Sequence, residues 1–115
     1  MAEEFEKVLT FEIERDGDTA VVKCHGRLVS GATEELYGEV KDLLAQTKVL
    51  VVDLADLTYV DSTGLGTLVR LHASGRKLGC EFKLLHLGKQ LRNLLKLTNL
   101  LSAFGQVEDH GINIA

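Results

Sequence analysis

Proline and tryptophan are absent from this sequence, cysteine occurs only twice, and basic residues are not in excess. The 13 Lys and Arg face 17 Asp and Glu, which argues against a nucleic-acid-binding protein, because such proteins carry a basic surface for the phosphates. The longest purely apolar run covers residues 49–52, whereas a helix that spans a bilayer needs about 20 apolar residues. We therefore expect no direct nucleic-acid binding and no insertion into a membrane.

The first residues also lack the pattern of an export signal. Residues 1–6 are acidic, where a signal peptide would be basic and then apolar. We therefore expect a cytoplasmic protein in which Cys24 and Cys80 remain reduced thiols in the core. A chain of 115 residues can bury a core of its own, and no linker or repeat divides it. The sequence predicts a single domain over residues 1–115.

The hydrophobic pattern predicts strands and helices in alternation. Alternating apolar residues over 9–28, interrupted by a turn at 16–18, indicate an antiparallel hairpin. Further strands are predicted at 48–54, at 82–85 and near 107. Helices are predicted at 32–44, from 62 to either 75 or 79, and at 91–98, with a short helical turn at 100–104.

This order of elements predicts a fold and directs attention to one edge of it. Strand–helix–strand occurs twice in succession, so right-handed crossovers place three strands parallel. The expected fold is α/β, with a mixed sheet of four or five strands, an N-terminal antiparallel hairpin and packed helices. The connections at 28–33, 55–64 and 86–90 then converge at the carboxyl ends of the parallel strands, where such folds place their sites.

None of the residue patterns typical of an enzyme is complete. No two of the four histidines have a metal-ligand spacing. Gly64 and Gly66 lack the third glycine of the dinucleotide fingerprint, since Val69 stands there, and close packing of a helix on a sheet explains them better. The carboxylates at 53, 56 and 61 have no nucleophile–base pair beside them, so we expect them to cap turns and a helix. We predict no catalytic residue, no metal site and no cofactor.

The segment 61–66, Asp-Ser-Thr-Gly-Leu-Gly, opens the second predicted helix at the edge where the connections converge. Asp61 or Ser62 is suited to be the N-cap, whose side-chain oxygen accepts a free backbone N–H. Ser62 would also be exposed at a helix N-terminus, where free N–H groups and the helix dipole favour a phosphate. The two interpretations are compatible, and both stay open.

Over nearly its whole length the sequence resembles the STAS domain family, and in particular the bacterial anti-sigma factor antagonists. The resemblance rests on five segments: Gly-Arg-Leu at 26–28, Val-Val-Asp-Leu at 51–54, the 61–66 motif, Phe-Lys-Leu-Leu at 82–85, and Leu-Leu-Lys-Leu-Thr at 94–98. It implies a non-enzymatic partner switch. In this family the serine directly after the aspartate, here Ser62, is phosphorylated by an anti-sigma factor that is itself a serine kinase. The unphosphorylated domain binds that anti-sigma factor and frees the sigma factor, and a phosphatase resets it.

The chain departs from the family's pattern at Val29, where many antagonists carry an aspartate that is linked to kinase recognition. The predicted partner-binding residues surround the motif: Ser30, Asp61, Ser62, Thr63, Gly64 and Lys89. The exposed side of the helix over 62–76 is expected to contribute to the same surface. Two other functions stay open, namely a constitutive STAS subunit of a lipid-transporting ABC complex and a nucleotide-binding module.

Overall fold

The structure is a computed structural model and describes residues 8–99, 107–108 and 111–112. Its elements in chain order are β1 (Leu9–Asp16), β2 (Thr19–Leu28), α1 (Thr33–Leu44), β3 (Val49–Val60), α2 (Ser62–Leu78), β4 (Glu81–Leu85), α3 (Lys89–Leu97), β5 (Val107–Glu108) and β6 (Gly111–Ile112). The predicted helical turn at 100–104 lies outside the described residues.

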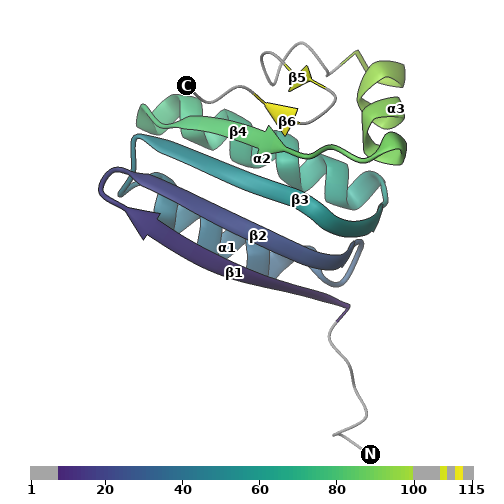
Figure 1. Cartoon of the computed structure of the whole chain (residues 1–115), viewed down its shortest axis with the longest axis horizontal. Helices are drawn as coiled ribbons and strands as arrows, with labels where there is room; N and C mark the ends of the chain where they lie inside the picture. Colours follow the sequence, from purple (N-terminus) through teal and green to yellow (C-terminus); the bar gives the residue numbers. More distant parts are fainter. Residues whose placement is uncertain (1–7, 100–106, 109–110, 113–115) are drawn as a thin grey trace, which may run out of the picture.

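The main sheet has four strands in the order β1-β2-β3-β4. β1 and β2 are antiparallel, and β2–β3 and β3–β4 are parallel, which confirms the predicted hairpin and the mixed α/β sheet. The predicted strand near 107 exists as β5, but it pairs with β6 in a separate two-stranded sheet, so it adds no fifth strand to the main sheet. In Figure 1, α1 and α2 lie side by side behind the sheet, and α3 lies beyond the end of β4.

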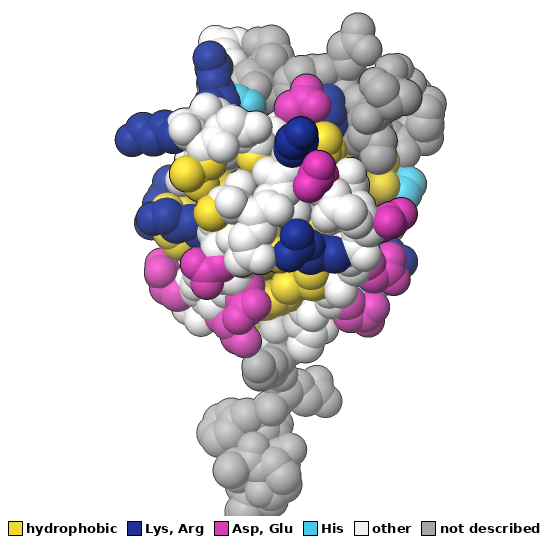
Figure 2. Space-filling view, turned by 90° about the vertical axis from the view of Figure 1, so that its left-hand side faces the viewer, with side chains coloured by type: hydrophobic (Ala, Val, Ile, Leu, Met, Phe, Trp, Pro, Cys, Tyr) yellow, Lys and Arg dark blue, Asp and Glu magenta, His cyan; other side chains and the backbone are white. Residues whose placement is uncertain are grey.

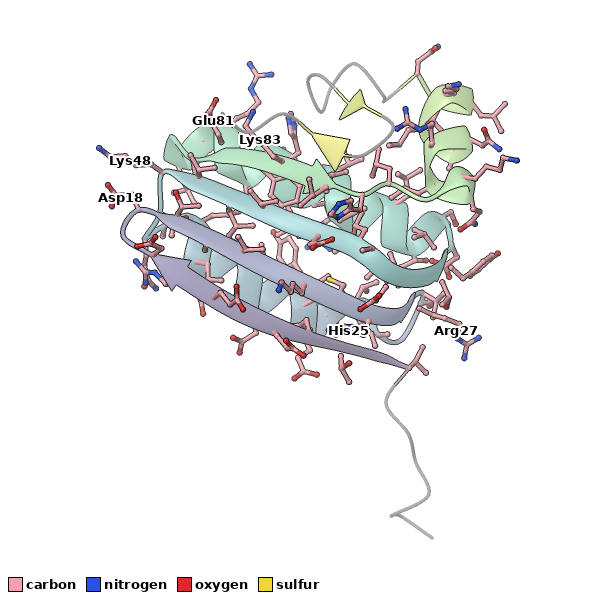
Figure 3. The ribbon with its side chains drawn as sticks, in the orientation of Figure 1. Asp18, His25, Arg27, Lys48, Glu81 and Lys83 are labelled. Carbon is pink, nitrogen blue, oxygen red and sulfur yellow. The ribbon has the colours of Figure 1, made fainter. Side chains whose placement is uncertain are left out.

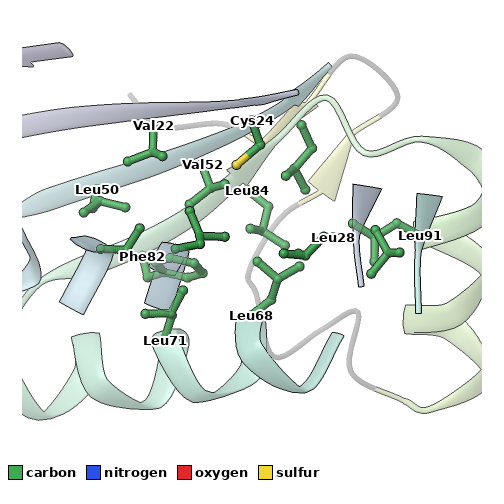
Figure 4. Packing of buried hydrophobic residues seen from close by; sticks show 14 of the residues in the cluster. Val22, Cys24, Leu28, Leu50, Val52, Leu68, Leu71, Phe82, Leu84 and Leu91 are labelled. Atoms are coloured by element: carbon green, nitrogen blue, oxygen red, sulfur yellow. The ribbon is translucent and has the colours of Figure 1, made fainter. Parts of the chain in front are cut away.

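The core lies between the sheet and these two helices. Alternate residues of β2 face the helices, and Ala20, Val22 and Cys24 are at most 1% exposed. Figure 4 shows Leu68 and Leu71 of α2 pointing toward the side chains of the sheet. Each such leucine is fully buried, which stabilises the fold by about 1.5–3 kcal/mol relative to an exposed side chain. This packing fixes α2, and with it the 61–66 motif, against the sheet.

Both cysteines are free and buried, as predicted. Burial, with a smaller effect of the nearby Asp53 carboxylate, raises the pKa of the Cys24 thiol to about 12. Since the thiolate is the nucleophile, Cys24 is an inert packing residue at neutral pH.

β3 is longer than predicted, and the connection expected at 55–64 is reduced to Asp61 alone. Residues 55–60 continue the parallel pairing with β2, but the register shifts twice, between Lys23 and His25 and between Gly26 and Arg27. Each irregularity places an extra residue in β3 and changes which side chains face the core. The period-two alternation is therefore lost in the sequence although the strand continues. As a result, the carboxyl end of β3 leads directly into the start of α2.

Candidate functional site at the start of helix α2

Asp61 joins two connections at the carboxyl edge of the sheet. It is the N-cap of α2, and its Oδ1 accepts the backbone N–H of Gly64 at 2.8 Å. Its Oδ2 accepts the backbone N–H of Ser30, in the β2–α1 connection, at 2.9 Å. The backbone N–H of Asp61 in turn donates to the carbonyl of Leu28 at 3.2 Å. Of the two N-cap candidates, the structure thus selects Asp61, and it brings Ser30 to the motif as predicted.

The carboxylate of Asp61 carries its negative charge over the whole neutral range. Hydrogen bonds from the backbone N–H groups of Ser30 and Gly64 hold its pKa below the usual value for an aspartate, because they stabilise the charged form. A full negative charge therefore lies directly beside Ser62.

Ser62 is the first residue of α2, and its side chain is exposed. Its hydroxyl makes no hydrogen bond within residues 8–99. Thr63 is exposed as well, and its carbonyl accepts the hydroxyl of Thr67 at 3.0 Å. Since Asp61 already caps the helix, the Ser62 hydroxyl is available to a modifying enzyme or a partner without loss of the cap.

Gly64 has a structural part in this site. It is buried, and a Cβ at this position would collide with the carbonyl oxygen of Leu28 and come within 2.9 Å of the Leu28 Cγ. The missing side chain lets the first turn of α2 pack closely against the end of β2. Gly64 is therefore the buried contact that fixes the first turn of α2, and with it Ser62, against β2.

Lys89 lies at the start of α3, and its side chain is exposed. It lines a groove of about 220 Å³ together with Tyr59 and Val60 of β3. The neighbouring Gln90 fixes this arrangement, since its Nε2 donates to the Val60 carbonyl at 2.7 Å and its Oε1 accepts the Val60 N–H at 3.0 Å. Gln90 thus pairs with β3 where β4 has already ended. This pair of Gln90–Val60 hydrogen bonds, the Gln90 clamp, holds the start of α3, and with it Lys89, at the edge next to the motif. Lys89 itself makes no direct hydrogen bond or ion pair to Asp61 or Ser62 in the described structure.

Sequence reasoning missed Gln90, and no local pattern marks it. A glutamine near the start of a helix is ordinary, and its role depends on the end of β3, 30 residues earlier in the chain.

A second groove, of about 390 Å³, lies between Val8–Leu9 and the connection at Ser30–Ala32, with Glu34 and Glu35 at its border. The carboxyl edge of the sheet therefore has one groove at the β2–α1 connection and another at the end of β3.

Several charged side chains of the sheet lie close to one another. The His25 ring, on β2 (Figure 3), has its Nδ1 2.9 Å from Asp56 on β3 and its Nε2 3.4 Å from Glu12 on β1. His86 Nδ1 lies 2.9 Å from an oxygen of Asp53. Among the described residues no group of three His, Cys, Asp or Glu side chains could hold a metal ion. Nor does any described helix have the length and apolar character needed to cross a membrane.

Comparison with known proteins identifies several chains of the same fold. The chain is similar to an anti-sigma factor antagonist of Mycobacterium paratuberculosis, with 28% identity, a TM-score of 0.70, and coverage of 84% of this chain and 83% of that one. It is similar in fold to the unphosphorylated anti-sigma factor antagonist SpoIIAA, with 18% identity, a TM-score of 0.70, and coverage of 79% and 82%. A sulfate transporter family protein of Wolinella succinogenes has the same fold, with 22% identity, a TM-score of 0.71, and coverage of 81% and 78%.

A curated relative gives the same family assignment. The STAS-domain containing protein of Pseudomonas aeruginosa is 29% identical over 91 residues, which are 77% of this chain and 88% of the relative. The family model described as STAS domain matches residues 10–111. The chain therefore belongs to the STAS domain family.

Proposed function

We propose that this chain is a cytoplasmic, non-enzymatic partner-switching protein of the anti-sigma factor antagonist type, folded as one domain over residues 1–115. In its unphosphorylated form it binds an anti-sigma factor that is a serine kinase, and that kinase releases itself by phosphorylating Ser62. A phosphatase restores the binding form. The observation that carries this proposal is the exposed hydroxyl of Ser62 at the first turn of α2, beside a cap that Asp61 supplies. The similarity to a mycobacterial anti-sigma factor antagonist supports it.

A phosphate on Ser62 is compatible with the folded domain. It adds a charge of about −1.5 to −2, which takes the formal charge of the chain from −4 to about −6. The positive end of the α2 dipole favours a negative charge at this position. The helix cap does not depend on the Ser62 hydroxyl, because Asp61 accepts the Gly64 N–H. Phosphorylation is therefore expected to leave the fold intact.

A partner packed over Ser62 would not accommodate the same phosphate. Covering it removes a dianion from water, and the adjacent Asp61 carboxylate contributes a further negative charge on the domain's side of the interface. Placing like charges against one another in an interface typically costs several kcal/mol. Since each 1.4 kcal/mol changes an equilibrium constant tenfold, such a loss is enough to release the partner.

The proposal is tested with three immobilised forms of the chain: wild type, Ser62→Ala and Ser62→Glu. Each is exposed to a lysate of the native organism, and the retained proteins are identified by mass spectrometry. We expect a kinase-like protein on wild type and Ser62→Ala but not on Ser62→Glu. Purified kinase and ATP should then place one phosphate on wild type and on the matched control Thr63→Ala, and none on Ser62→Ala. A Ser62→Glu chain that has lost its circular dichroism signal would contradict the mechanism.

The same experiment separates the alternatives. If all three forms retain the same partners, Ser62 is no switch, and the chain is a constitutive STAS subunit, such as that of a lipid-transporting ABC complex. The shared fold with a sulfate transporter family protein makes this the second candidate. Saturable binding of ATP to the isolated chain, measured by calorimetry, would instead favour the nucleotide-binding module.

A further inference from the structure

Positive charge is concentrated on two helices of an otherwise acidic chain. α2 and α3 hold six of the 13 Lys and Arg and none of the 17 Asp and Glu. α1, which packs beside α2, carries four carboxylates and one lysine, Lys41. In the end-on view of Figure 2, dark-blue side chains project along one margin of the molecule, above a group of magenta ones. The helical layer thus has a basic part and an acidic part.

Two cations meet where α1 and α2 touch. The guanidinium of Arg70, on α2, lies 4.0 Å from the centroid of the Tyr37 ring, on α1. The ammonium of Lys41 lies 5.7 Å from the same centroid. Ser74 of α2, together with the two cations, lowers the pKa of Tyr37 below its usual value, because these groups favour the charged phenolate. Two positive charges and the Ser74 side chain therefore surround one half-buried tyrosine.

Lys41 and Arg70 differ from Lys23 and Lys48, two cations at the sheet, in having no counter-charge. Lys23 has Glu14 at 3.8 Å, and Lys48 has Asp18 at 3.9 Å. Within the described residues, neither Lys41 nor Arg70 has a carboxylate at ion-pair distance. The cation–π contacts stabilise an exposed cation by about 0.5–1 kcal/mol but do not cancel its charge. An anion at the junction would therefore gain the attraction of both cations.

The surface next to these cations allows a partner to approach closely. Gly66 and Ala73 lie two turns apart on the outer face of α2, and Val69 between them is partly buried against the core. A Cβ added at Gly66 would meet no other atom within 4 Å, and Ala73 is exposed. The low face beside Arg70, so called because its side chains are short, is thus weakly apolar. A polypeptide can cover such a face while its carboxylates reach the cations.

We infer that Lys41 and Arg70, with the hydroxyls of Tyr37 and Ser74, form an anion-binding site at the α1–α2 junction that takes an acidic segment of a partner protein. The aromatic ring and the low face of α2 offer contact area that a polypeptide covers and a free inorganic anion does not. Arg70 lies eight residues after Ser62, about 12 Å along the helix axis. That exceeds the screening length of about 8 Å at physiological ionic strength, so the site does not depend on the charge state of Ser62.

The test uses the ¹⁵N-labelled chain, titrated at low ionic strength with a hexaglutamate peptide and followed by NMR. We expect saturable shifts of the amides of Tyr37, Lys41, Arg70 and Ser74, and none with hexaglutamine. Lys41→Gln combined with Arg70→Gln should weaken binding at least tenfold. The matched control Lys48→Gln removes another exposed cation, which already has a carboxylate partner, and it should bind as wild type does. Arg70→Lys keeps the charge and should retain most of the affinity.

Three outcomes would overturn the inference. One is the absence of shifts, or shifts centred on other residues. Another is an equal loss of affinity in Lys48→Gln, which would mean that only the overall charge matters. The last is displacement of the peptide by inorganic phosphate at equal charge concentration, which would assign the site to small anions. Because Ser62 is unchanged in every sample, these results are independent of whether Ser62 is a switch.

Discussion

Gly64→Ala tests how the fold sets the position of Ser62. The added Cβ meets the Leu28 carbonyl, which is backbone at the end of a central strand, and the Leu28 side chain at 2.9 Å. Relief requires the first turn of α2 to move away from β2 or the end of β2 to shift, since no flexible side-chain end can absorb the clash. Overpacking of this kind typically costs about 1–3 kcal/mol, and a backbone obstacle places it near the upper value.

Gly66→Ala is the matched control for this change. It lies two residues further along the same helix, and a Cβ there meets nothing within 4 Å. Both substitutions gain up to about 1 kcal/mol in helix propensity, but only Gly64→Ala also bears the clash. We therefore expect Gly64→Ala to be about 2 kcal/mol less stable than wild type and Gly66→Ala to be about 1 kcal/mol more stable. The two variants should differ by about 3 kcal/mol, or roughly 10–20 °C in Tm.

The assay is thermal and urea unfolding of the three proteins, followed by circular dichroism. Partner retention at a temperature where all three are folded adds a functional measurement. Because the clash displaces the turn that carries Ser62, Gly64→Ala should bind the retained partner more weakly even when it is folded. Equal Tm values for the two alanine variants would refute the reasoning, since the close approach of α2 to Leu28 would then have no energetic consequence.

Substitutions at two further residues test other contacts of the site. Asp61→Ala should destabilise the domain, and Asp61→Asn should do so less, because the amide oxygen can still accept one of the two N–H groups. The pKa of Asp61 is lowered on folding, so its contribution is complete above the unfolded pKa of about 3.9 and is lost as the pH falls through the lower folded pKa. Unfolding curves of wild type and Asp61→Ala should therefore converge on acidification, and a constant difference would contradict the role of the charge. Gln90→Leu leaves the N–H and C=O of Val60 without their partner and should lower the free energy of unfolding by about 1–3 kcal/mol. Hydrogen exchange at the Val60 amide should also become faster. Unchanged exchange would mean that these two hydrogen bonds are not formed in solution.

The order of strands and helices was predictable from the sequence because most elements carry a regular hydrophobic period, and the first half of β3 is an unbroken apolar run. β2 alternates cleanly between buried and half-buried residues over 19–24, and α1 buries Leu36, Val40 and Leu44 at helical spacing. The end of α2 was predicted as one of two glycines, and Gly79 is the correct one, since its φ of +75° suits a helix C-cap whereas Gly75 is buried inside the helix. Local periodicity is thus enough to find elements and many of their ends.

The parts that could not be predicted depend on contacts between distant residues. The second half of β3 lost its alternation through two register shifts, which only the pairing with β2 reveals. Asp61 could be recognised as a possible cap, but its bond to Ser30 spans 31 residues of chain. Tyr37 and Arg70 stand on different helices, and nothing in either local sequence indicates that they meet. Pairwise contacts of this kind are set by packing, which a single sequence does not display.

The departure at Val29 changes the surface chemistry of the site more than its shape. The β2–α1 connection is held by backbone groups: the Ala32 N–H donates to the Val29 carbonyl at 2.9 Å, and the Ser30 N–H donates to Asp61 at 2.9 Å. Neither bond uses the side chain at position 29, so the connection needs no aspartate there to adopt its conformation. What position 29 lacks is a carboxylate, so Asp61 supplies the negative charge that adjoins Ser62. In the proposed mechanism, a kinase that binds this edge would contact Asp61, Ser30 and the two flanking grooves, and its acidic residues would pair with the cations of α1 and α2.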